Sequence, residues 1–291
     1  MNVITTPAST HKRIAVITMA RNDEFFLNRW IAYYGEQFGE ENLYVYLDGK
    51  DQPIPAMAGK ANVIHVERVA EHVVKAEKRR LNFLSQKAKE LFKNYHIVIG
   101  VDADEFIVLD PRINKTLREY LSEKRINSSI SSLGIDVGQD TNSEKILDRE
   151  RPFLQQRNYA VTSSRYTKPS ILARPLRWGS GFHRIKWHNF HIDKNLYMFH
   201  FGSVDYDMIM DRFKDKDRMA TGRERHIKKR LSTITLITDK VKRGKIKDGD
   251  KWLPPARMIQ KIFRPIYAYN KPSTLLKKTV IKIPERFKDT V

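Results

Sequence analysis

The chain has 291 residues, 41% of them hydrophobic, contains no cysteine and carries a formal net charge of +20. A chain of this length and composition can bury the core of one large α/β domain or of two smaller domains. The lack of cysteine excludes a disulfide framework, a thiolate zinc site and a cysteine nucleophile, and it is consistent with a reducing compartment.

The N-terminal part begins with a short apolar run, "IAVITM" at residues 14–19. This run is too short for the hydrophobic region of a signal peptide, and polar residues follow it at once. The chain contains no apolar window of 18 residues, so we expect no membrane-spanning segment. These two observations predict a cytoplasmic protein.

The first elements predict a βαβ unit. Residues 14–19 have the composition of a buried strand, and apolar residues then recur every three to four positions up to Gly39, which is typical of an amphipathic helix. A second strand, "LYVYL" at residues 43–47, ends at Asp48-Gly49. A strand, a helix and a second strand in this order favour a parallel sheet.

The pattern continues up to about residue 110. A third strand is expected at residues 62–66, an amphipathic helix between Val74 and Lys93, and a fourth strand over residues 97–109, "IVIGVDADEFIVL". Together these elements predict an open, mostly parallel, doubly wound α/β sheet. In such sheets ligands bind outside the carboxyl ends of the strands. Residues 20–22, Asp48 and the acids of the fourth strand all fall at such ends.

Beyond Asp110 the pattern weakens. Residues 126–135 predict another strand, which could be antiparallel, and residues 136–160 are polar and loop-like. A compact strand at residues 195–201 carries His200, and basic helical segments follow it. We therefore expect a catalytic domain over residues 11–205 and a basic, mainly helical extension over residues 206–291.

The fourth strand carries three carboxylates within four positions: Asp102, Asp104 and Glu105. Because side chains alternate along a strand, Asp102 and Asp104 should share one face. Two such carboxylates could clamp Mg²⁺ or Mn²⁺, and the metal could bridge the phosphates of a nucleotide diphosphate. Acids that merely end a strand at a surface turn, or a phosphatase with an aspartyl nucleophile, are the alternatives. An EF-hand is excluded, because this stretch lacks the glycine at loop position 6 and the glutamate at loop position 12.

The stretch "DADEF", with "MARNDEFFLNRWIAYYGEQFG" upstream and "YVYLDG" between them, resembles the glycosyltransferase family 2-like proteins of GT-A fold. The nearest resemblance is to the bacterial branch with a D-x-D-E-F motif. It extends over residues 14–110 and, more loosely, over residues 165–207, where "KP", "GFH" and "FHFGS" stand. The resemblance implies a Rossmann-like GT-A domain and transfer of a hexose from a nucleotide-diphosphate sugar.

The resemblance also assigns roles by position. The loop Ala20-Arg21-Asn22 would pack on the base and ribose of the donor, and Asp48 would contact the same nucleoside. Asp102 and Asp104 would hold the metal together with the donor ribose and diphosphate, and His200 would complete the metal shell. The chain departs from the family at Asp23, where a glutamate is usual, and it lacks the aromatic motif that often follows the acidic strand.

Other polar residues are candidates for the chemistry of transfer. An inverting transfer needs a carboxylate to take the proton of the acceptor hydroxyl. We favour Asp136, in a loop after a predicted strand, over Asp140; a turn-capping acid is the alternative. His183 follows two glycines and could bind the diphosphate or the acceptor. Arg79 and Lys168 could neutralise phosphate, although such residues are more often solvated surface charges.

The basic charge is concentrated at the C-terminal end. Residues 211–291 hold 24 Lys and Arg against 9 Asp and Glu, a net charge of +15, whereas residues 1–210 hold 30 against 25, a net of +5. Such a segment binds anions: nucleic acid, anionic lipid head groups or phosphorylated substrates. No nucleic-acid-binding motif accompanies it. The apolar and aromatic residues of "WLPPARMIQKIFRPIYAY" favour docking on an anionic membrane surface instead.

The sequence therefore predicts a metal-dependent, inverting glycosyltransferase. Its donor would be a nucleotide sugar, and its acceptor a saccharide or lipid-linked saccharide of lipopolysaccharide or capsule synthesis. The protein would be cytoplasmic, with the inner face of the cell membrane as a peripheral location. The alternatives are a nucleic-acid-binding protein that uses the basic extension and a metal-dependent phosphohydrolase.

Overall fold

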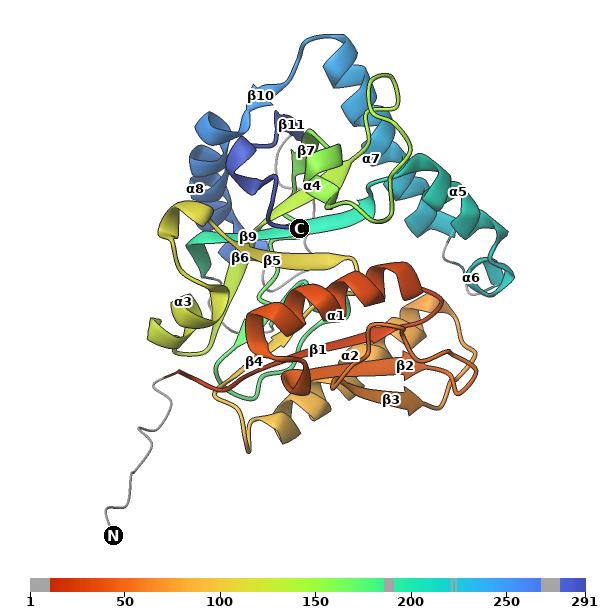
Figure 1. Cartoon of the computed structure of the whole chain (residues 1–291), viewed down its shortest axis with the longest axis vertical. Helices are drawn as coiled ribbons and strands as arrows, with labels where there is room; N and C mark the ends of the chain where they lie inside the picture. Colours follow the sequence, from red (N-terminus) through yellow and green to blue (C-terminus); the bar gives the residue numbers. More distant parts are fainter. Residues whose placement is uncertain (1–10, 186–190, 221, 223, 268–277) are drawn as a thin grey trace.

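The computed structural model describes residues 11–185, 191–220, 222, 224–267 and 278–291 (Figure 1). The elements up to residue 109 follow the predicted order. They are β1 (Ile14–Ala20), α1 (Glu24–Phe38), β2 (Leu43–Asp48), β3 (Asn62–Val66), α2 (Val73–Leu91), β4 (Ile97–Gly100) and β5 (Glu105–Leu109).

The first four strands form the parallel part of the sheet, in the order β3-β2-β1-β4. Successive side chains of β1 point to opposite faces, so that Val16 packs in the same apolar cluster as Trp30 of α1. Ala15 and Ile17 instead join Leu84 of α2. Helices α1 and α2 therefore cover opposite faces, and Figure 1 shows α1 in front of the strands and α2 behind them. The predicted open α/β sheet is confirmed.

The predicted strand over residues 97–109 is in fact two strands. β4 ends at Gly100, and residues 101–104 form a turn in which the Glu105 amide donates to the Asp102 carbonyl over 3.0 Å. The prediction that Asp102 and Asp104 share one strand face is therefore wrong, since both side chains leave from this turn. The apolar run is continuous in sequence because the strands on both sides of the turn are buried.

The remaining elements follow β5. They are α3 (Leu117–Glu123), β6 (Ser129–Gly138), α4 (Phe153–Gln156), β7 (Tyr159–Thr162), β8 (Ile171–Leu172), β9 (Ile192–Ser203), α5 (Tyr206–Lys214), α6 (Lys216–Ala220), α7 (Glu224–Lys242), β10 (Lys247–Asp248), α8 (Gly249–Tyr267) and β11 (Thr279–Lys282), with short 3₁₀ turns at Glu40–Asn42, Pro111–Ile113, Ser180–Phe182 and Glu285–Phe287.

Strand β6 joins two parts of the mixed sheet. Its first residues pair with β8, which continues the parallel part through β4. Its later residues pair antiparallel with β7 and parallel with β9, and β9 pairs antiparallel with β5. The turn at residues 101–104 lies where the chain leaves the first part of the sheet at β4 and enters the second at β5.

Strand β6 also runs further than predicted. We expected a strand over residues 126–135 and a loop over residues 136–160, but β6 continues to Gly138, and α4 and β7 occupy part of the expected loop. Asp136 therefore lies inside a buried strand. The strand tolerates this acid because His200 and Thr233 bind its carboxylate.

The segment from residue 206 onwards packs against the sheet. Its described part contains the expected helices α5 to α8, and also β11, which pairs antiparallel with β7. Helix α7 contacts β6, β7 and β9. The domain boundary at residue 205 stays a prediction. Within the described ranges, no helix combines the length and the hydropathy that a membrane span requires.

Gly134 of β6 lets the backbone of residues 163–167 approach the strand closely, and this segment leads to Lys168 of the candidate site. A Cβ atom at this position would lie 2.5 Å from Thr167 N, against the segment that carries Tyr166 and Lys168. We expect Gly134→Ala to lower the free energy of unfolding by about 1–3 kcal/mol, because two backbones would have to separate. Urea denaturation measures this change.

Gly35 of α1 offers a matched control. A Cβ atom there would meet the flexible side chain of Glu40 at 3.1 Å and that of Leu43 at 3.9 Å, and no backbone. Alanine is favoured over glycine inside a helix, so Gly35→Ala should leave the stability unchanged or raise it. Equal destabilisation by the two substitutions would contradict the role assigned to Gly134.

Candidate active site

A chain of ion pairs surrounds the acidic turn. Arg80 of α2 donates from Nη1 to Asp102 Oδ1 over 2.8 Å, and Lys168 donates from Nζ to Asp102 Oδ2 over 3.0 Å. Lys168 Nζ also lies 2.5 Å from Glu105 Oε1. Arg80 pairs in addition with Glu77 of the same helix. Both oxygens of Asp102 are thus bound by cations.

This ion-pair chain is buried at Lys168 and Glu105, whereas the side chain of Asp102 is 27% exposed. Lys168 is 1% exposed and Glu105 0%. Burial raises the pKa of Glu105 to about 7, although Lys168 beside it opposes the rise. Burial also disfavours the charged form of Asp102, but the charges of Lys168 and Arg80 outweigh it and hold the pKa of that carboxyl well below its usual value. Asp102 is therefore held as a carboxylate.

A second polar group lies on three neighbouring strands. In the strand register, His200 of β9 stands opposite Glu105 of β5 on one side and Asp136 of β6 on the other. His200 Nδ1 lies 2.7 Å from Asp136 Oδ1, and His200 Nε2 lies 3.6 Å from Asp104 Oδ2. The Tyr166 ring stacks on the imidazole with ring centroids 3.8 Å apart.

The hydrogen bonds of Asp136 define the tautomer of His200. An ionised carboxylate only accepts hydrogen bonds, so Nδ1 carries a proton and donates it to Asp136. Thr233 of α7 donates to the other oxygen of Asp136 over 3.1 Å. In neutral His200, Nε2 then has a free lone pair directed to the same region as Asp104.

Arg230 of α7 completes this group, and sequence reasoning missed it. Its Nη2 donates to Asp104 Oδ2 over 2.7 Å. The residue stands in the basic stretch "RERHIKKRL", where nothing in the spacing separates it from its solvated neighbours. The C-terminal extension therefore contributes a side chain to the acidic turn.

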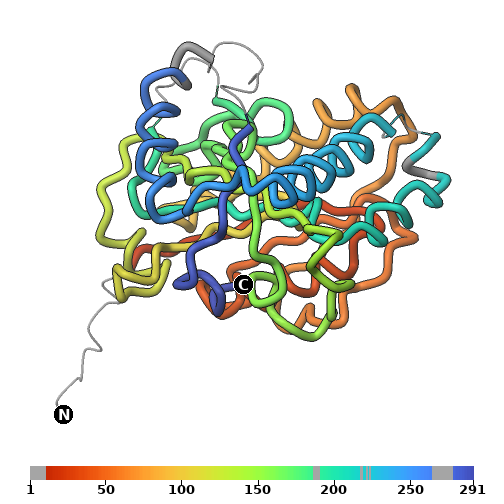
Figure 2. Tube along the Cα trace, turned by 90° about the horizontal axis from the view of Figure 1, so that it is seen from above, coloured from red at the N-terminus to blue at the C-terminus, as the bar shows by residue number. Residues whose placement is uncertain are grey.

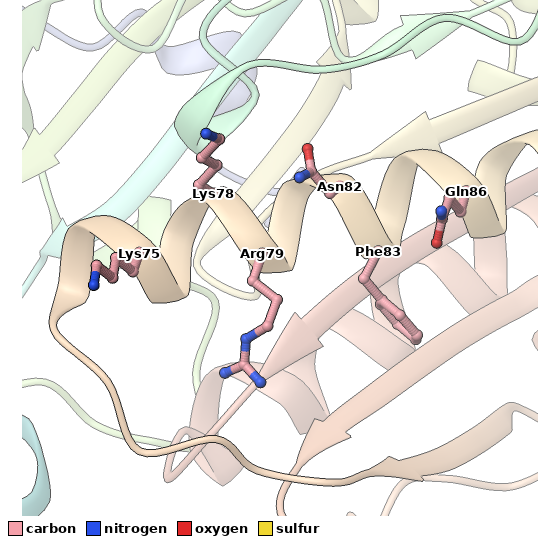
Figure 3. A pocket seen from close by; sticks show the side chains of 6 residues that line it. All are labelled: Lys75, Lys78, Arg79, Asn82, Phe83 and Gln86. Atoms are coloured by element: carbon pink, nitrogen blue, oxygen red, sulfur yellow. The ribbon is translucent and has the colours of Figure 1, made fainter.

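The structure does not bring Arg79 to the acids. Its side chain pairs with Glu71 and donates to the Val69 carbonyl. Figure 3 shows Arg79 and Phe83 on one side of α2, where they line a surface pocket of about 420 Å³. The adjacent Arg80 reaches the acids instead. Consecutive helical residues point about 100° apart, so this one-residue step changes the face of the helix.

The loops after β1 and β2 lie side by side, as predicted. Arg21 donates to the Asp48 carbonyl over 2.8 Å and pairs with Asp51. The backbone amide of Asn22 donates to Gln52, and Asn22 adopts a left-handed φ of 50°. These loops occupy the same edge of the sheet as the acidic turn, because β2, β1 and β4 are parallel neighbours.

The same loops also contact the C-terminal extension. Arg212 of α5 donates to Asp23 over 2.9 Å, and Asn22 donates to Asp215 over 3.2 Å. His183 Nδ1 lies 2.8 Å from the Arg165 carbonyl. It follows Phe182, whose ring faces both Arg80 and Lys168.

The three predicted metal ligands, Asp102, Asp104 and His200, do not all lie together. Among the described residues, no group of three or more acids and histidines is arranged to hold a metal on its own. Asp104 and His200 do converge, with Arg230 paired to Asp104, while Asp102 is held by two cations. A Cβ atom on Gly202 would lie 2.8 Å from both His200 Nε2 and Arg230 Nε, so the glycine allows these two side chains to approach each other. One carboxylate and one imidazole fit a divalent cation whose other ligands are water and phosphate.

Comparisons with known proteins do not assign this chain to a family. No family model matches the chain, and no curated protein matches it. Among solved structures, the mannosyltransferase PcManGT from Pyrobaculum calidifontis, in complex with GDP-Man and Mn²⁺, is similar over 87% of this chain and 88% of its own length. The identity is 9% and the TM-score 0.37. A likeness at this level says nothing about the reaction or the residues of this chain.

Proposed function

We propose that the chain is a glycosyltransferase of GT-A type that moves a sugar from a nucleotide diphosphate to a hydroxyl group of a saccharide acceptor. One observation carries the proposal: an acid-bearing turn follows β4 at the carboxyl edge of the parallel strands, and its Asp104 converges with His200. This edge is where open α/β sheets bind their ligands. The sequence resemblance to the D-x-D-E-F branch supports the same proposal.

The donor nucleoside would lie over the loops after β1 and β2. Arg21 donates to the Asp48 carbonyl and Asn22 to Gln52, so hydrogen bonds join the two loops, which would give the base and ribose of the donor a defined surface to pack on. The diphosphate would face the cations Arg80 and Arg230, whose guanidinium groups can neutralise phosphate. Arg79 and His183 stay predictions without a contact that supports a donor role.

Asp104 and His200 would hold Mg²⁺ or Mn²⁺. When bound, the metal would stabilise the negative charge of the leaving nucleotide diphosphate. Asp136 fixes the His200 ring with Nδ1 protonated, which keeps Nε2 available as a ligand. Both oxygens of Asp136 are bound already, so we propose it as a positioning residue for His200 rather than as the base. Asp102 would keep Arg80 in place beside the phosphates.

The acceptor side of the proposal follows from the resemblance. It implies a single inverting displacement by a hydroxyl of a growing polysaccharide, of the lipopolysaccharide or capsule kind. It also implies a cytoplasmic enzyme that meets its acceptor at the inner face of the membrane. A phosphohydrolase differs in one measurable way: it would release phosphate from nucleotides when no acceptor is present.

A thermal-shift screen tests the proposal. Nucleotide diphosphates and nucleotide sugars should raise the melting temperature in the presence of Mn²⁺, because a ligand at one hundred times its Kd adds about 2.7 kcal/mol of stability. The gain should disappear without metal and in Asp104→Asn. It should persist in Asp211→Asn, which changes an exposed acid of α5. Failure of every nucleotide, or stabilisation that survives Asp104→Asn, would contradict the proposal.

A further inference from the structure

Helix α8 is anchored to the sheet by one narrow face. Leu253, Ala256 and Gln260 are buried at spacings of three and four residues, and the helix packs on β9 and β11. Trp252 also donates from its indole nitrogen to Thr162 of β7 over 3.2 Å. Figures 1 and 2 both place α8 at the outer edge of the molecule.

The opposite face of α8 is apolar as well, although it is exposed. Met258 is 58% exposed and Ile262 59%, and Pro254 and Pro255 precede them on the same side. Phe263 is 46% exposed as well, but it follows Ile262 directly and so points about 100° away from it, outside this face. A surface helix usually turns charged and polar residues outward, and one that is apolar on both sides is normally covered. The outward face of α8 therefore has the composition of a contact surface.

Cations border this apolar face. Lys251 and Lys261 are exposed on the helix itself. Arg257 donates to the Lys194 carbonyl over 2.6 Å, which places the exposed Lys194 beside the helix. The acid at the start of the helix, Asp250, pairs with Arg286 and so adds little net negative charge. The border of the face is thus positive.

We propose that α8 docks the protein on an anionic lipid surface, with Met258 and Ile262 inserted among the lipids and Lys251 and Lys261 bound to acidic head groups. This is the composition of helices that lie in the plane of a membrane interface. Residues 268 and 269, which continue the apolar stretch in the sequence, lie outside the described residues.

Two other occupants fit the face less well. Nucleic acid is bound through contacts to its phosphates by Lys and Arg, and an exposed aliphatic face contributes nothing to such contacts. A second copy of the chain would bring the same cations against one another, in a protein with a net charge of +20. A lipid surface matches both the positive border and the apolar face of α8. Its head groups bind the cations, and its acyl chains surround the aliphatic side chains.

Vesicle co-sedimentation of the full chain tests this proposal without donor or acceptor, so its outcome is separate from that of the glycosyltransferase proposal. Vesicles containing phosphatidylglycerol should bind the protein, and phosphatidylcholine vesicles should bind it at least about tenfold more weakly. The double variant Met258→Glu/Ile262→Glu should lose at least about tenfold in affinity for the anionic vesicles. Lys251→Glu/Lys261→Glu should reduce the preference for anionic vesicles.

Ile146→Glu is the matched control, since Ile146 is 70% exposed and lies before α4, away from α8 in sequence. It should bind vesicles like the unchanged chain. All substituted side chains are exposed, and circular dichroism with a melting curve verifies the fold. Equal vesicle binding by the double variant and the control would overturn the proposal. So would a dimer that only Met258→Glu/Ile262→Glu dissociates, or DNA binding that this variant abolishes.

Discussion

Replacing His200 with alanine should weaken Mn²⁺ binding by more than roughly 100-fold, measured by calorimetry with a nucleotide diphosphate present. The loss of a metal ligand costs more than the loss of the residue that orients it, and the orienting residue alone accounts for about 10–100-fold. Asp136→Asn should therefore weaken Mn²⁺ binding by about 10–100-fold. The hydrogen bond between His200 Nδ1 and Asp136 is the physical reason for the link.

The double variant separates the two roles that Asp136 could have. If Asp136 acts through His200, His200→Ala/Asp136→Asn should bind Mn²⁺ no more weakly than His200→Ala alone. If Asp136 were the base for the acceptor hydroxyl, Asp136→Asn would lower turnover and leave the Mn²⁺ affinity unchanged. His65→Ala, which removes an exposed imidazole on β3, serves as the control and should change neither quantity.

Replacing Lys168 with methionine should lower the free energy of unfolding by about 3–5 kcal/mol. Lys168 is buried and is shared between Asp102 and Glu105, so its removal leaves two carboxylates with less compensating charge. Methionine keeps most of the side-chain volume of lysine, so the loss of stability reports the removal of the ammonium charge. Because Lys168 opposes the rise in the pKa of Glu105, that pKa should rise further in the variant. Denaturant titration measures the stability.

Lys87 provides the comparison for this experiment. It pairs with Glu90 on the exposed side of α2, at 2.8 Å. Exposed pairs contribute about 0–1 kcal/mol, so Lys87→Met should change the stability by no more than that. A loss in Lys168→Met as small as in Lys87→Met would mean that the buried ion pairs rearrange and that Asp102 is held by other contacts.

Sequence periodicity predicted the parallel half of the molecule well. The predicted strands at residues 14–19 and 43–47 each lie within one residue of β1 and β2, and β3 was predicted over its full length. The prediction worked because these strands are buried and are separated by amphipathic helices, so burial leaves a clear period in the sequence. It also placed the acids at the carboxyl edge, which follows from strand direction alone.

The details of the candidate site could not be predicted in the same way. The turn at residues 101–104 leaves no break in the apolar run, because β4 and β5 are both buried. Arg80 lies between the two faces of its helix, so its role depends on where the turn places Asp102. Arg230 is 126 residues from Asp104, and only the packing of α7 on β6 and β9 brings them together. Such contacts arise from tertiary structure and leave no local pattern.

The pairing of β11 with β7 has a consequence for synthesis. β7 ends at Thr162, but its partner on one side is residues 279–282, which are synthesised only after all the elements from β8 to α8. Until they arrive, β7 presents unpaired amide and carbonyl groups, and such an open edge is a template for pairing with other nascent chains. A truncation that removes β11 would leave this edge open permanently and expose the protein to aggregation.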